Sequence, residues 1–199
     1  MPRLSEETRE RRRQHILASA WMCFSRNGFQ ATSMDEVIAA SGMSSAAVYR
    51  YFRSKEEIIH ASAREGVGRV AGVFAALLAS EPCLSPAQSF ELFEAELRRR
   101  TDNPGYDMTR IALQAWAEAL RDPVLHDLHQ EQYRGALDIA TKLARRWRDV
   151  GYLPATAEPE AVATTLFTVL HGLIVVHLTV GGVDFGALRA GLAALGSAV

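Results

Sequence analysis

The segment at residues 32–57 constrains this chain more than any other, because it holds two short helical patterns joined by a tight turn. The first pattern begins with a capping box, in which the Ser33 hydroxyl accepts from a backbone amide and the Glu36 carboxylate reaches back. The turn at residues 41–44 reads Ser-Gly-Met-Ser, and its glycine can adopt the left-handed conformation that a tight turn requires. This arrangement predicts a helix-turn-helix, whose second helix enters the DNA major groove.

The rest of the chain also shows helical periodicity and no strand-like alternation, so we expect an all-α fold of about nine helices. Ser5 can cap the first helix, and Asn27-Gly28 should end it. We expect a helix-turn-helix domain at residues 1–56 and a second helical domain at residues 57–199. The helices beyond the first three are expected at residues 54–78, 86–100, 107–121, 123–150, 159–180 and 184–195.

Composition agrees with a globular protein that binds nucleic acid at one end only. Hydrophobic residues make up 48% of the 199 residues, which allows a sizeable core. The formal net charge is −1, but residues 1–60 carry nine Lys and Arg against seven Asp and Glu. The remainder carries 13 against 16, so the mildly basic module is N-terminal.

Several features predict a reduced, cytoplasmic location. Cys23 and Cys83 give neither a disulfide framework nor metal-ligand spacing. The N-terminus is charged and lacks the apolar stretch of a signal peptide. The longest apolar run, residues 166–180, contains two histidines and is shorter than the roughly 20 residues needed to span a bilayer. We therefore expect no membrane partner and no cofactor.

The helix-turn-helix segment offers two kinds of DNA contact, one to phosphates and one to base edges. Most side chains at the start of the second helix are small, so direct reading of bases should be sparse. Shape and phosphate contacts should then carry more of the specificity. The expected phosphate contacts are Thr32, Ser33, Tyr49, Tyr51 and Lys55, and the expected reading positions are Ser44, Ser45, Ala46, Ala47 and Arg50. Arg50 could equally bind phosphate.

Residues 9–60 resemble the DNA-binding domain of the TetR family of bacterial transcriptional regulators. The resemblance rests on many spaced positions: Ile16, Phe24, Gly28-Phe29, Thr32, Val37, the turn at 41–44, Val48-Tyr-Arg-Tyr-Phe52 and Ser54-Lys-Glu-Glu57. The resemblance implies that these same residues bind phosphates and read bases. The family often has Lys-Gly-Thr where this chain has Ser45-Ala46-Ala47, and His in place of Arg50, so the operator sequence does not follow from the resemblance.

The resemblance also implies that the C-terminal helices form a homodimer and hold a small inducer. The helix expected at residues 159–180 is apolar nearly all round, which indicates burial on more than one face. Expected dimer contacts are Leu166, Leu170, Gly172, Leu173, Leu188, Gly191, Leu192 and Leu195. Aromatic and weakly polar side chains in apolar stripes are candidates for a hydrophobic ligand pocket: Phe74, Phe90, Phe93, Gln114, Trp116, Tyr133, Phe167 and His171.

Two alternatives remain beside a ligand-released repressor. A metal-dependent enzyme is conceivable because His126 and His129 share a helix face near Asp127 and Glu131, but no GxSxG, phosphate loop or HExxH motif is present. We therefore expect no enzymatic activity. The other alternative is a ligand-binding helical protein that does not bind DNA sequence-specifically.

Overall fold

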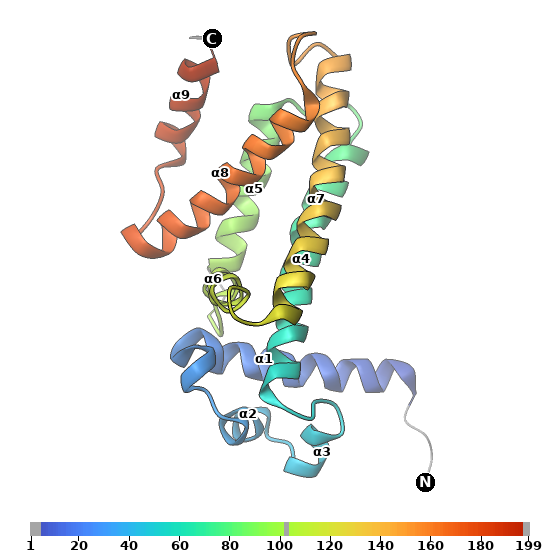
Figure 1. Ribbon diagram of the computed structural model, residues 1–199, viewed down its shortest axis with the longest axis vertical. Helices are drawn as coiled ribbons and strands as arrows, with labels where there is room; N and C mark the ends of the chain where they lie inside the picture. Colours follow the sequence, from blue (N-terminus) through green and yellow to red (C-terminus); the bar gives the residue numbers. More distant parts are fainter. Residues whose placement is uncertain (1–4, 102–103, 197–199) are drawn as a thin grey trace. The chain divides into compact units, whose positions relative to one another are not determined.

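The computed structural model describes residues 5–101 and 104–196, with side chains for all of these except 66–70, 100 and 195–196. Within this part of the chain the secondary structure consists of nine α-helices without a strand, which confirms the all-α prediction (Figure 1). The helices are α1 (Glu6–Ala31), α2 (Met34–Ser41), α3 (Ser45–Tyr49), α4 (Lys55–Ala79), α5 (Pro86–Thr101), α6 (Met108–Glu118), α7 (Pro123–Asp149), α8 (Pro159–Val180) and α9 (Phe185–Gly196).

The chain divides into two compact units, which are described separately. The first contains the chain up to Val67 together with Arg100–His129, and the second contains Gly68–Arg99 and Gln130–Val199. Helices α4 and α7 therefore each contribute residues to both units. The domain boundary expected after residue 56 stays a prediction.

The first unit is built around α1, whose buried stripe has the helical spacing expected from the sequence. Ile16, Leu17 and Phe24 are fully buried and pack in one core with Val48 of α3 and Ile58 of α4. Complete burial of such side chains stabilises the fold by about 1.5–3 kcal/mol each. This core fixes the short helix α3, which could not persist alone at five residues.

The caps expected around the helix-turn-helix are present. Ser33 accepts from the Glu36 amide, and the Glu36 carboxylate accepts from the Ser33 amide, so the capping box is confirmed. Ser44 caps α3 by accepting from the Ala47 amide. Gly42 adopts the left-handed conformation (φ 64°) between α2 and α3, as the turn requires.

Helix α1 is interrupted at Gly28 rather than ended there. This glycine has φ 83° and ψ 167°, a conformation open essentially only to glycine, and one more helical turn follows to Ala31. The break removes backbone hydrogen bonds, and the Gln114 amide of α6 replaces two of them. Its Oε1 accepts from the Phe29 amide at 2.7 Å, and its Nε2 donates to the Phe24 carbonyl at 3.1 Å.

The second unit has two hydrophobic clusters. One joins Phe74 of α4 to Trp147 of α7 and Phe167 of α8, and all three side chains are buried. The Trp147 indole is also satisfied, because it donates to the Leu84 carbonyl at 2.8 Å. The other cluster packs Leu173 of α8 against Phe185 of α9.

Helix α8 is long and apolar enough to cross a bilayer, judged by length and composition alone. This differs from the expectation based on residues 166–180, because the helix begins at Pro159 and is 22 residues long. Only 17% of the tested stretch is buried in the structure. A soluble protein would need to cover the remaining apolar surface with another chain.

Candidate nucleic-acid interface and ligand-binding unit

The helix-turn-helix presents a sharp division between inward and outward side chains. On α3 and the turn after it, Val48 and Phe52 are buried, whereas Tyr49 and Arg50 are exposed. At the start of the helix Ser44, Ser45 and Ala46 are exposed and Ala47 is half-buried. The outward edge at the start of α3 therefore consists of the small side chains expected from the sequence, and Arg50 is the long side chain expected to read bases.

The two tyrosines that flank Arg50 have different environments. Tyr49 is 45% exposed, and within the described residues its hydroxyl has no hydrogen-bond partner, so it can donate to a phosphate. Tyr51 is half-buried and packs against the core of the first unit. The Tyr51 ring therefore helps to hold α3 in place, independently of any contact that its hydroxyl makes.

Thr32 and Lys55 lie beside each other, but both already have partners in the protein. The Lys55 ammonium donates to the carbonyls of Phe29, Gln30 and Thr32 at 2.9–3.3 Å. The Thr32 side chain is buried, and its hydroxyl donates to the Gly28 carbonyl at 2.8 Å. These contacts attach the start of α4 to the end of α1. The predicted contacts of both residues with phosphate stay predictions.

Two side chains of α1 that the sequence reasoning did not single out also hold the helix-turn-helix. His15 Nε2 lies 2.8 Å from the Ser41 carbonyl at the end of α2, and the Arg13 guanidinium lies 5.5 Å from the centre of the Phe52 ring. A cation over an aromatic ring adds about 0.5–1 kcal/mol at an exposed site. The signal in the sequence was the arginine run before Ile16, which periodicity alone assigns to a solvated face.

A side-chain hydrogen bond joins α4 to the start of α7 inside the first unit. His60 Nε2 lies 2.7 Å from Asp122 Oδ2, and Asp122 also accepts from the amides of Val124 and Leu125. These contacts, the one with His60 foremost, lower the pKa of the Asp122 carboxyl. The pairing was missed because nothing in the sequence relates positions 62 residues apart.

Most of the predicted pocket residues meet in the second unit. Phe74 lies 4.8 Å from Phe93 and 5.2 Å from Phe167, measured between ring centres. Tyr133 and His171 join the same cluster, with ring centres 5.3 and 6.0 Å from that of Phe167. Phe90 packs instead against Leu173 and Phe185.

The other two predicted pocket residues belong to the first unit. Gln114 bridges the break in α1, as described above, and the Trp116 ring centre lies 6.3 Å from that of His129. The pocket assignment of all eight residues stays a prediction.

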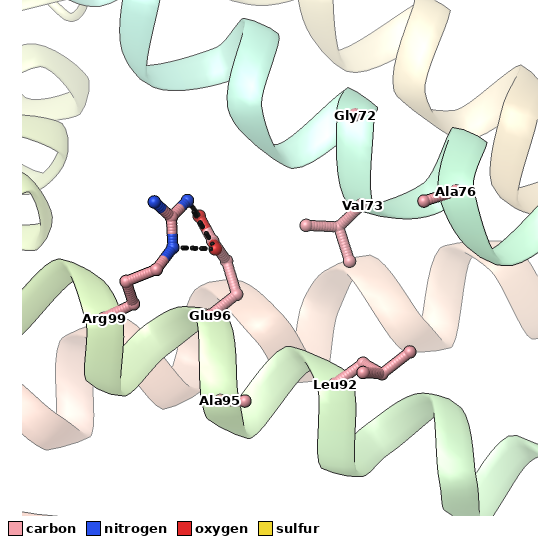
Figure 2. A pocket seen from close by; sticks show the side chains of 7 residues that line it. All are labelled: Gly72, Val73, Ala76, Leu92, Ala95, Glu96 and Arg99. Carbon is pink, nitrogen blue, oxygen red and sulfur yellow. Dashed lines mark hydrogen bonds and ion pairs between the residues drawn. The ribbon is translucent and has the colours of Figure 1, made fainter.

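A groove of about 460 Å³ lies between α4 and α5 of the second unit (Figure 2). This size falls in the range of small-molecule sites. Its walls are mainly apolar, and an ion pair between Arg99 and Glu96 (2.7 Å) lies at one end. The lining residues are Gly72, Val73, Ala76, Leu92, Ala95, Glu96 and Arg99, none of which was predicted.

The exposed faces of α8 and α9 are smooth and carry small or β-branched side chains. On α8 the exposed row is Ala161, Thr164, Thr165, Thr168, Gly172, Val175, Val176 and Thr179. The four threonine hydroxyls each donate to the carbonyl four residues earlier at 2.7–2.9 Å, so they need no water when covered. On α9 the exposed row is Gly186, Ala187, Ala190, Gly191, Ala193 and Ala194.

The predicted dimer leucines lie mostly behind these rows. Leu173 is buried in its own chain, and Leu166, Leu170, Leu188 and Leu192 are half-buried against the cores of the second unit. Gly172 and Gly191 belong to the exposed rows. The side chain of Leu195 lies outside the described residues.

His126 and His129 are the conceivable metal ligands that the sequence offers. Among the side chains that the structure describes, no group of three or more His, Cys, Asp and Glu is placed to hold a metal ion.

Comparison with known proteins agrees with this arrangement. Residues 16–62 match the model of the bacterial regulatory proteins of the tetR family, and residues 92–195 match the BetI-type transcriptional repressor C-terminal domain. The fold and its helix-turn-helix define a DNA-binding transcriptional regulator. The chain belongs to the TetR family, with a C-terminal domain of the BetI type, which confirms the resemblance inferred from residues 9–60.

Relatives give the same class, and a solved structure shows the same fold. The transcriptional repressor AcnR of Corynebacterium glutamicum is 28% identical over 163 residues, covering 81% of this chain and 79% of AcnR. The repressor Rv1474c of Mycobacterium tuberculosis is 37% identical over 73 residues, covering 37% of this chain and 39% of that protein. GusR of Salmonella enterica has a similar fold, with a TM-score of 0.70 at 24% identity over 87% of this chain and 85% of GusR.

Proposed function

We propose that this protein is a homodimeric repressor that binds an operator through two helix-turn-helix units and leaves it when a small hydrophobic inducer binds. The observation that carries the proposal is the outward edge of α3, where small side chains and two long donors, Tyr49 and Arg50, stand exposed beside a fully buried Val48. Such an edge fits closely into a major groove, with few bidentate base contacts and several phosphate contacts. The family match supports the same assignment.

Titration of duplex DNA at several salt concentrations tests DNA binding directly. Binding through phosphates releases counterions, so the logarithm of the affinity should fall steeply and linearly with the logarithm of salt concentration. Weak binding that is independent of salt would instead favour the alternative of a ligand-binding protein without DNA recognition.

The proposed dimer forms through the exposed rows of α8 and α9, with the two helices of each chain packing against those of the other. Glycine, alanine and internally bonded threonine permit close approach of helices, and the exposed part of α8 needs a cover. Two-fold symmetry also suits the binding of two half-sites about 34–36 Å apart or a multiple of this.

The proposed inducer is a moderately hydrophobic small molecule held by the second unit. The aromatic cluster around Phe167 and the apolar groove between α4 and α5 support this chemistry. Two proteins of similar fold were solved with ligands, namely SmeT with triclosan and a regulator from Saccharomonospora viridis with choline. Triclosan is the apolar probe of choice. It should raise the unfolding temperature and weaken duplex binding, because a ligand stabilises the state it prefers.

A cytoplasmic location and the lack of enzymatic activity belong to the same proposal. A regulator must reach chromosomal DNA, and a dimer partner explains the apolar surface of α8 without a membrane. Fractionation of cells should place the protein with soluble components rather than with membranes.

A further inference from the structure

The first turns of α1 carry arginines that none of the interactions described so far explains. Arg9 and Arg12 are exposed, and within the described residues neither forms a hydrogen bond or an ion pair. Ordinary surface arginines on a helix often pair with acids three or four residues away. Glu10 is close in sequence, but its carboxylate accepts from Arg13 and Gln14 instead.

Helical geometry separates the charges on this part of α1 into two faces. Glu6, Glu10 and Gln14 are four residues apart and so share one face, and Gln14 also donates to Glu65 of α4 at 3.1 Å. The acidic face is therefore turned toward α4.

The arginines occupy the face that leads to the helix-turn-helix. Arg9 is four residues before Arg13, whose guanidinium lies over the ring of Phe52 directly after α3. Arg12 is four residues before Ile16, which is buried in the core shared with Val48. In Figure 1 the first turns of α1 run past α3 toward the N-terminus. Arg9 and Arg12 therefore precede, along α1, the contact of Arg13 with Phe52.

From this geometry we infer that Arg9 and Arg12 bind the DNA phosphate backbone beside the groove that α3 enters. The occupant is a duplex phosphate, since two guanidiniums three residues apart, with no partner among the described residues, can donate to the oxygens of consecutive phosphates. Neither residue reads a base, so the pair adds affinity and orientation without sequence preference. The inference rests on the proposed function. It extends the proposed DNA-binding surface to the N-terminal turns of α1.

The test measures the salt dependence of binding for Arg9→Ala, Arg12→Ala and the double variant, on a mixed-sequence duplex about four helical turns long and on a duplex selected by the wild-type protein. Each substitution should reduce the slope of log affinity against log salt by about one per bound protomer. Both duplexes should lose affinity by the same factor. Arg9→Lys should keep most of the slope, because it keeps the charge.

Arg110→Ala is the matched control, since Arg110 is an exposed arginine of the same unit that lies on α6 and pairs with Asp107. It should leave the slope unchanged, and thermal unfolding should show that all variants fold. A double variant with the wild-type slope, or a loss confined to the selected duplex, would overturn the inference while leaving the proposed function intact. If the wild-type protein itself shows no salt-dependent binding, the proposed function fails instead.

Discussion

At the scale of single residues, burial decides which parts of the helix-turn-helix are free to meet DNA. Val48 is inaccessible, whereas Tyr49 exposes nearly half of its surface, and its hydroxyl has no partner among the described residues. The sequence predicted this division well, because a helix buries positions three to four apart. It did not predict that Lys55 and Thr32 bond to carbonyls near the end of α1, since those partners exist only in the folded unit.

Tyr49→Phe removes a single hydroxyl from the exposed edge of α3. A hydrogen bond to a charged phosphate contributes about 1.5–3 kcal/mol, so affinity for duplex DNA should fall roughly tenfold to a hundredfold. The unfolding temperature should not change, because the hydroxyl has no partner within the protein's described residues. Fluorescence anisotropy and calorimetry measure the two quantities. Equal affinity of both proteins would remove Tyr49 from the interface.

The Asp122 carboxylate predicts a pH dependence of stability. Its pKa is lowered, foremost by the hydrogen bond from His60, so the folded state favours the ionised form. The resulting stabilisation is present above the unfolded pKa of about 3.9 and is lost as pH falls through the lowered folded value. Asp122→Asn should therefore be less stable than wild type at neutral pH, with a difference that shrinks in acid. A difference independent of pH in urea unfolding would contradict this assignment.

At the scale of elements, the interruption of α1 shows what local pattern can and cannot predict. The Asn27-Gly28 pair correctly marks a break, because Gly28 adopts a conformation that other residues avoid. The sequence places Gln114 in an apolar stripe, and that placement suggested a ligand pocket. The structure shows its amide bonded to Phe24 and Phe29, a role set by a contact across 85 to 90 residues.

Gln114→Leu tests this bridge between α6 and α1. The substitution leaves a backbone amide and a carbonyl without their partner, at a cost of about 1–3 kcal/mol in the free energy of unfolding. Gln132→Leu is the control, since Gln132 is half-buried on α7 and forms no hydrogen bond within the described residues. Urea unfolding should show a clear loss for the first variant and little change for the second. Equal stabilities would mean that the two bonds contribute nothing.

The exposed row of α8 leads to a prediction about the oligomeric state. Val176→Glu places a charge on the face proposed to meet a partner chain, where burying it without a counter-ion is costly. The variant should sediment as a monomer at a concentration where the wild-type protein is a dimer. Val124→Glu is matched to it, since both valines are about half exposed and Val124 lies at the start of α7. Monomerisation by both variants, or by neither, would contradict the proposed interface.

At the scale of the whole molecule, the all-helical fold and the class of regulator were predictable from sequence. Periodicity, caps and one specific motif determine them, and the family match confirms both. The groove between α4 and α5 was not predictable, because Ala76, Ala95 and their neighbours form a hollow only when two helices meet. The apolar length of α8 was underestimated for a simpler reason: Thr164 and Thr165 interrupt the run of aliphatic residues, but the helix continues back to Pro159.

Two copies of this chain together should recognise a specific duplex sequence. Selection of bound sequences from a random pool of duplex DNA tests it most directly, with the wild-type protein at moderate salt. We expect enrichment of a two-fold symmetric site whose half-sites lie one helical turn, or a multiple of it, apart. Recovery of a pool that stays random, or of a single half-site without symmetry, would contradict it.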